Sequence, residues 1–165
     1  MADRKGFTLV ELMFVSVIML TLVGMSIPRL NRAYPYYALK SSSKNLAALM
    51  RYAQNLAVVE QICYRLNVDL EKNSYWLTRK SSLNGASPED YEAVSTPLGN
   101  TQFLPQTISF HSFKLKDSRL SGQKYLSCYP DGYVDETTVV IVDKFGDNLS
   151  VMAGGRIGRV TIKEE

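Results

Sequence analysis

The sequence contains few of the residues from which catalytic and metal sites are usually built. It has one histidine, two cysteines and one tryptophan in 165 residues. His111 lies in an alternating stretch, where we expect a surface or packed residue rather than a base or a metal ligand. Asp131, Asp135 and Glu136 do not form a complete calcium-binding loop, and no glycine-rich phosphate loop leads into a helix. We therefore expect no enzyme activity, no metal and no cofactor.

The two cysteines, Cys63 and Cys128, are far apart in the chain. That separation excludes a Cys-x-x-Cys redox or zinc motif. Outside the cytoplasm the two thiols are able to form one disulfide if the geometry allows it. The alternative is two thiols buried in the core, and the sequence leaves both open.

Charge and composition are ordinary for a folded protein. The net charge is +3, with 45% hydrophobic and 21% charged residues. This excess of positive charge is too small to indicate nucleic-acid binding by itself. The length suits one membrane segment followed by one globular domain of roughly 100 residues.

An apolar run of membrane length stands near the start of the chain, from Phe7 to Ile27. As a helix it would be about 31 Å long, close to the bilayer core of about 30 Å. Pro28, Arg29 and Arg32 end the run, so we expect a transmembrane helix over residues 7–28. The run is too long for a removed signal peptide, and no Ala-x-Ala cleavage site follows it.

Glu11 is the unusual residue of this run, because a carboxylate in hydrocarbon costs several kcal/mol unless it is paired. A plain signal anchor would leave it unexplained. Basic residues do not settle the orientation, since Arg4 and Lys5 flank one end and two arginines flank the other.

The segment Gly6-Phe7-Thr8-Leu9-Val10-Glu11 resembles the cleavage and methylation motif of type IV prepilins and type II secretion pseudopilins. The resemblance implies that residues 1–6 are a leader, that a membrane peptidase and methyltransferase cuts between Gly6 and Phe7, and that Phe7 becomes the N-methylated amino terminus. It also implies that Glu11 pairs with the terminal amine of a neighbouring subunit. The alternative is that Glu11 only favours the first turn of its own helix through the helix dipole.

A helical pattern continues as an amphipathic spine over residues 29–60. The apolar stripe consists of Leu39, Leu46, Leu49, Met50, Ala53, Leu56, Ala57 and Val59. Pro28 and Pro35 predict a kink or break. Tyr34, Tyr36 and Tyr37 suit either a membrane interface or packing under the domain.

Residues 61–165 read as an antiparallel β domain, which we place in the periplasm. We expect strands over Ile62–Leu70, Tyr75–Thr78, Thr107–Lys116, Lys124–Tyr129, Thr137–Val142, Leu149–Ala153 and Arg159–Lys163, with a loop from Ser81 to Gln102. The fold class is therefore α+β, a pilin-like helical spine packed on antiparallel sheet.

Within this superfamily the chain resembles the GspH/FimT group of minor pseudopilins and minor pilins. The resemblance is carried by Leu46–Val59 leading into the first hairpin, by Cys128-Tyr129-Pro130-Asp131-Gly132 and by Gly158-Arg159-Val160. It implies a structural subunit of a periplasmic filament, made as a single-pass protein of the bacterial inner membrane. Its partners would be other pilins or pseudopilins, the prepilin peptidase and the inner-membrane assembly platform. The sequence supports a secretion pseudopilus and a type IV pilus equally.

The basic C-terminal residues Arg156, Arg159 and Lys163 suggest a second function. In FimT-like minor pilins a basic C-terminal Gly-Arg-x-Arg motif is associated with DNA binding for uptake. Here the motif is Gly-Arg-Ile-Gly-Arg, one residue longer. The alternative is a turn and an edge strand with solvated arginines, where positive charge also blocks sheet-to-sheet association.

Overall fold

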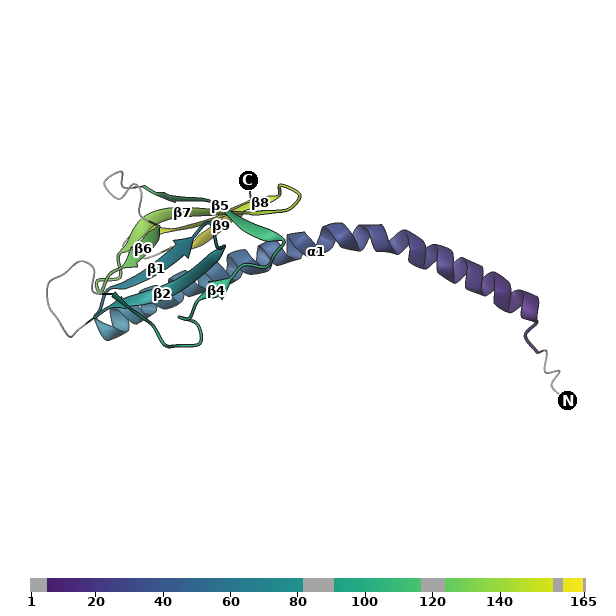
Figure 1. Ribbon diagram of the computed structural model, residues 1–165, viewed down its shortest axis with the longest axis horizontal. Coiled ribbons are helices and arrows are strands. Elements are labelled where there is room, and N and C mark those ends of the chain that lie inside the picture. The colour runs from purple at the N-terminus through teal and green to yellow at the C-terminus, as the bar shows by residue number, and fades with distance from the viewer. Residues whose placement is uncertain (1–5, 82–90, 117–123, 156–158, 165) are drawn as a thin grey trace. The chain divides into compact units, whose positions relative to one another are not determined.

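The computed structural model describes residues 6–81, 91–116, 124–155 and 159–164, with residues 26–33 described by their backbone alone. The chain divides into two compact units, Met1–Tyr34 and Pro35–Glu165. One helix, α1 (Leu9–Glu60), contributes to both units (Figure 1). Of the kink or break predicted between Pro28 and Pro35, the break is excluded, because the helical backbone is continuous there. Pro35 is fully buried in the second unit, and this packing offsets the hydrogen bond that a proline removes from a helix.

Local side-chain chemistry accounts for the end of α1. Gln61 follows the last helical residue with a φ of 55°, the left-handed conformation that commonly terminates helices. Its side-chain amide Nε2 also donates a hydrogen bond to the carbonyl of Val58 at 2.7 Å. The last carbonyl groups of a helix have no partner within it, and the Gln61 side chain supplies a partner to one of them.

The described strands form one antiparallel sheet in the second unit, in the order β3-β2-β1-β6-β7-β8-β9 (Figure 1). Two strands lie off this path, with β4 pairing with β2 and β5 pairing with β7. The strands are β1 (Tyr64–Asp69), β2 (Ser74–Lys80), β3 (Tyr91–Ala93), β4 (Gln102–Phe103), β5 (Ile108–Leu115), β6 (Tyr125–Cys128), β7 (Val134–Asp143), β8 (Asn148–Gly155) and β9 (Thr161–Glu164).

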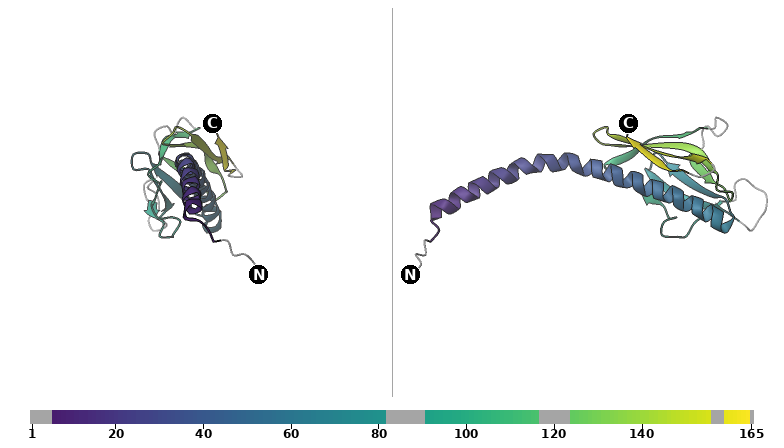
Figure 2. Two further views of the ribbon diagram at one scale, coloured as in Figure 1. Left: turned by 90° about the vertical axis from the view of Figure 1, so that its right-hand side faces the viewer. Right: turned by 180° about the vertical axis from the view of Figure 1, so that it is seen from behind.

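In the second unit, α1 lies along one face of the sheet, as Figure 2 shows from two further sides, and the core lies between them. The helix buries Leu39, Leu46, Met50, Ala53 and Ala57. The sheet buries Leu66, Leu77, Leu126, Val139, Ile141 and Val151. These are alternate residues of their strands, so the opposite face of the sheet points away from the helix. The predicted α+β fold, a helical spine packed on antiparallel sheet, is confirmed.

Most strand predictions agree with the structure, and the differences have local causes. β3 lies in the middle and β4 at the end of the stretch predicted as a loop, and they are strands because they pair with β2. β7 begins at Val134, earlier than predicted, because the register shifts between Val134 and Thr137. Such a bulge interrupts the alternation on which the prediction rested.

Candidate functional site

The peptide bond between Gly6 and Phe7 lies outside α1 and is accessible. Both residues precede the helix and are exposed, and the Phe7 side chain keeps 74% of its surface. A Cβ placed on Gly6 would meet no atom within 4 Å. Nothing in the described fold therefore requires glycine at this position, and the geometry leaves the bond open to an enzyme.

Thr8 caps the amino terminus of α1, and Glu11 stands in the first helical turn. The backbone N–H of Glu11 donates to Thr8 Oγ1 at 3.2 Å, and the N–H of Leu12 donates to the Thr8 carbonyl at 3.2 Å. Thr-x-x-Glu is the sequence pattern of a capping box, so Thr8 was a readable signal that the sequence analysis missed. The Glu11 side chain is exposed in the isolated chain.

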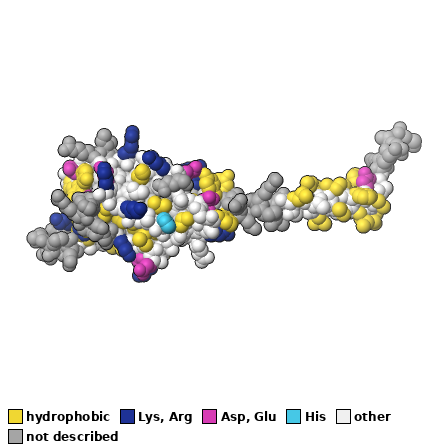
Figure 3. Space-filling model, turned by 90° about the horizontal axis from the view of Figure 1, so that it is seen from above, with side chains coloured by type: hydrophobic (Ala, Val, Ile, Leu, Met, Phe, Trp, Pro, Cys, Tyr) yellow, Lys and Arg dark blue, Asp and Glu magenta, His cyan; other side chains and the backbone are white. Residues whose placement is uncertain are grey.

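The helix that follows carries exposed apolar side chains along the whole described run, as Figure 3 shows. Leu9, Met13, Leu20 and Met25 keep 76%, 61%, 71% and 77% of their surface. Such a large exposed apolar surface indicates a surface with a partner, either protein or lipid. Among the described residues, no helix meets the length and hydropathy that a membrane span requires.

The two hydroxyl side chains of this run are satisfied within the helix itself. Ser16 Oγ donates to the carbonyl of Leu12, and Thr21 Oγ1 donates to the carbonyl of Ile18, both at 2.8 Å. Back-bonding of this kind lowers the cost of placing a hydroxyl in apolar surroundings. Glu11 is the only charged residue from Leu9 to Met25, so its carboxylate is the group that still needs a partner in apolar surroundings.

Cys63 and Cys128 are both free thiols in the structure. Tyr64, next to Cys63, pairs directly with Cys128 across β1 and β6, and both side chains are buried. Adjacent residues of an extended chain point to opposite faces, which directs Cys63 away from the core. Burial raises the pKa of the Cys128 thiol to about 12. Cys128 is thus buried, whereas Cys63 is half-buried.

The C-terminal segment contacts α1 through Val160 and Glu164. Arg156 lies outside the described residues, whereas Arg159 and Lys163 are exposed. Arg51 Nη2 donates to the Val160 carbonyl at 3.0 Å, and Tyr36 Oη donates to Glu164 at 2.8 Å, which raises the pKa of that tyrosine.

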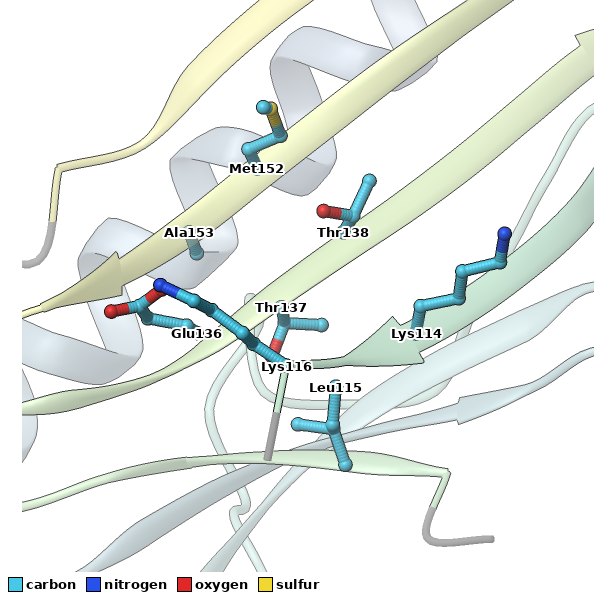
Figure 4. A pocket seen from close by; sticks show the side chains of 8 residues that line it. All are labelled: Lys114, Leu115, Lys116, Glu136, Thr137, Thr138, Met152 and Ala153. Carbon is cyan, nitrogen blue, oxygen red and sulfur yellow. The ribbon is translucent and has the colours of Figure 1, made fainter. Parts of the chain in front are cut away.

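A surface hollow of about 450 Å³ lies over β5, β7 and β8, on the sheet face away from α1. In Figure 4 the side chains of Lys116 and Glu136 extend toward each other and Lys114 points away from them. Lys116 Nζ lies 2.5 Å from Glu136 Oε2, and this contact raises the lysine pKa. Lys114 therefore adds an exposed positive charge to the face that also carries Lys163.

The acidic residues considered for calcium binding do not converge. Asp131 Oδ1 accepts the N–H of Tyr133, the buried Asp135 accepts the N–H of Ser127, and Glu136 pairs with a lysine. Within the described ranges, no three histidine, cysteine, aspartate or glutamate side chains group together for a metal. His111 is exposed at a bulge of β5.

Comparison with known proteins agrees with both parts of the chain. Residues 1–27 match the prokaryotic N-terminal methylation motif. No curated protein sequence matches the chain.

Solved structures provide the comparison for the domain. The minor pseudopilin EpsH from the type 2 secretion system of Vibrio cholerae is similar, with a TM-score of 0.61 and 13% identity over 76% of this chain and 96% of that chain. A second crystal structure of EpsH gives a TM-score of 0.60 and 14% identity over 76% of this chain and 95% of that chain. The type IV minor pilin FimU of Pseudomonas aeruginosa gives a TM-score of 0.50 and 19% identity over 76% of this chain and 87% of that chain. The predicted resemblance to type IV pilin-like proteins is thus confirmed in motif and fold, and these neighbours are pilin and pseudopilin subunits rather than enzymes.

Proposed function

We propose that this chain is a minor pseudopilin of a type II secretion system or a minor pilin of a type IV pilus, a structural subunit without catalytic turnover. The observation that carries the proposal is the amino-terminal arrangement. An accessible Gly6–Phe7 bond precedes a capped helix with an exposed apolar surface and one carboxylate, Glu11. Soluble monomeric proteins rarely expose a contiguous apolar surface of this size.

Processing would convert this arrangement into an assembly device. A prepilin peptidase would hydrolyse the bond after Gly6, releasing residues 1–6 and creating an amine on Phe7 that is then methylated. Glu11 lies one helical turn along from that amine. In a filament, the carboxylate of one subunit would pair with the ammonium of its neighbour, so that neither charge is buried alone.

The same apolar surface would serve in two surroundings. Before assembly, residues 7–28 would lie in the inner membrane, with the β domain in the periplasm. After assembly, they would pack against the equivalent helices of neighbouring subunits. The exposed apolar side chains from Leu9 to Met25 support both states, because lipid tails and apolar side chains are similar solvents for them.

Replacing Gly6 with alanine tests the processing step. The added methyl group would meet nothing in this chain, so the fold is unchanged and any effect reports on recognition by the peptidase. We expect intact-mass analysis of the membrane fraction to show wild-type chain beginning at N-methylated Phe7 and the Gly6→Ala chain still carrying its leader. Normal levels of mature Gly6→Ala protein would contradict the proposal.

The alternative function is DNA binding during natural transformation through Arg156, Arg159 and Lys163. One observation favours it, namely that Arg159 and Lys163 are exposed and Lys114 lies on the same sheet face as Lys163. Contacts of this kind would be sequence-independent and sensitive to salt. Gel shifts with the full chain should then lose binding in the Arg159→Ala, Lys163→Ala double variant. A Lys72→Ala variant, changed in the distant β1–β2 turn, should bind normally, and equal binding by all forms would exclude this function.

A further inference from the structure

A second feature of the sheet face away from α1 is a trough over β2, β1 and β6. Asn67 of β1 pairs with Trp76 of β2 on one side and with Tyr125 of β6 on the other. Residues directly opposite each other in a sheet point to the same face, so an amide lies between two aromatic side chains. The trough has a volume of about 280 Å³.

Neighbouring side chains hold this row in place. The Arg65 guanidinium lies 4.3 Å from the ring centre of Tyr125 and 3.6 Å from that of Tyr91. Cation–π contacts of this kind orient the aromatic ring. Asn67 Nδ2 donates to Thr78 Oγ1 at 3.0 Å. The trough is therefore largely formed before any ligand arrives, which lowers the entropic cost of binding.

The charges around the trough nearly cancel. Asp69, Glu71 and Lys124 line it together with the aromatic residues. Asp69 Oδ1 accepts the backbone N–H groups of Lys72 and Glu71, each at 3.0 Å, and these bonds lower the pKa of the carboxyl. With the Arg65 guanidinium beside Tyr125, two carboxylates face two cations, so the trough offers no net positive charge to a nucleic acid or another polyanion. The lining suits a ligand that is polar but uncharged.

The spacing of the row suits a single ring. The strands that carry Trp76 and Tyr125 lie two strand spacings apart, about 9.5 Å between their backbones. A ring stacked between two aromatic faces needs roughly 3.5–4 Å on each side. The C–H faces of a sugar carry partial positive charge and pack on the negative face of an aromatic ring, and its hydroxyl groups suit an amide and carboxylates.

We propose that this trough binds a neutral polysaccharide chain, with one sugar ring between Trp76 and Tyr125 above Asn67. The proposal stands on the geometry of the β domain and does not depend on the filament function. A protein segment as the occupant is the competing possibility, and failure to bind the sugar in the experiment below would favour it.

Trp76 is the only tryptophan of the chain, so intrinsic tryptophan fluorescence reports directly on this site. The full chain, held in a zwitterionic detergent that carries no sugar, would be titrated with the β-1,4-linked tetramer of N-acetylglucosamine. We expect a saturable change in emission. Tyr125→Ala should weaken binding at least about tenfold, whereas Tyr125→Phe should retain it. Phe103→Ala, an exposed aromatic residue of β4 outside the trough, is the matched control and should bind like wild type.

The salt dependence gives a second readout that a folding defect would not imitate. An uncharged ligand should bind equally at about 50 and 200 mM salt, whereas a polyanion would lose most of its affinity over that range. The absence of a saturable change, equal binding by Tyr125→Ala, or a steep loss with salt would each overturn the proposal. Failure here would leave leader cleavage unaffected, so the two proposals are judged separately.

Discussion

The pairing of Glu11 with a neighbouring amine makes a prediction whose size follows from the structure. Glu11→Gln keeps the length and shape of the side chain and removes its charge. In the isolated chain the cap of α1 survives, because the hydrogen bond to Thr8 comes from the backbone of residue 11. The loss is then confined to the interaction with the helix dipole, about 0.3–1 kcal/mol.

In a filament the same substitution should cost far more. The amine of a neighbouring subunit would remain buried in apolar surroundings without its counter-charge, and breaking a buried pair costs about 3–5 kcal/mol. A loss of about 3 kcal/mol corresponds to a factor of more than 100 in an equilibrium. Glu11→Gln protein should therefore be almost excluded from filaments when it competes with wild type, while its leader is removed normally.

Thr8→Ala is the matched control, because it removes the cap and leaves the charge. Losing a threonine cap costs about 1 kcal/mol, equivalent to about fivefold. The assay is co-expression of wild type with each variant, followed by mass spectrometry of the mature peptide ratio in sheared filaments and in membranes. Incorporation of Glu11→Gln at the wild-type ratio, or an equal defect in Thr8→Ala, would refute the pairing and leave Glu11 as a helix-terminal residue only.

Two further predictions concern the β domain. Gly154→Ala should lower the free energy of unfolding by at least about 2 kcal/mol, because its Cβ would lie 2.6 Å from Glu136 Cα and its φ is +154°. Gly146 has a φ of +94° but no atom within 4 Å of an added Cβ, so Gly146→Ala should lose less free energy of unfolding in the same urea titration. Equal losses in the two variants would show that the clash of residue 154 with Glu136 is relieved. Iodoacetamide should alkylate Cys63 before Cys128 in the native chain, since burial raises the pKa of Cys128 from 9.0 to about 12. The raised pKa of Cys128 also means that this thiol contributes stability below pH 9 that is lost as the pH rises toward 12. Between pH 9 and 12 the urea midpoint should therefore fall less steeply in Cys128→Ala than in wild type. Equal alkylation of the two cysteines, or an equal pH slope in the two proteins, would contradict the assigned burial.

The fold was predictable from sequence wherever a local period carried it. Leu39, Leu46 and Met50 recur at helical spacing, and their burial against the sheet follows from that recurrence. The hairpin of β1 and β2 was equally readable, because alternation and a polar turn are local signals. The cap by Thr8 belongs to this class too, since the capping pattern stands in the sequence.

Register between distant strands was not predictable in this way. Asn67 and Tyr125 are neighbours only because β6 pairs with β1 in one register, and a shift of one residue would place the aromatic ring in the core. β3 and β4 are too short to show a period of their own. Whether Cys63 faces Cys128 depends on strand orientation in the same way, and the sequence therefore left both cysteine alternatives open.

A uniformly apolar helix solves one problem of assembly and creates another. Its side chains suit lipid and the interior of a filament equally well, but they allow many packing registers of nearly equal energy. One buried polar group that has a single satisfactory partner removes this degeneracy, as buried asparagines do in coiled coils. Ser16 and Thr21 cannot serve, because their hydroxyl groups are already bonded to carbonyls of α1. Under the proposed function the register of the whole subunit therefore rests on Glu11, and its position as the fifth residue after the cleaved bond sets the step between subunits.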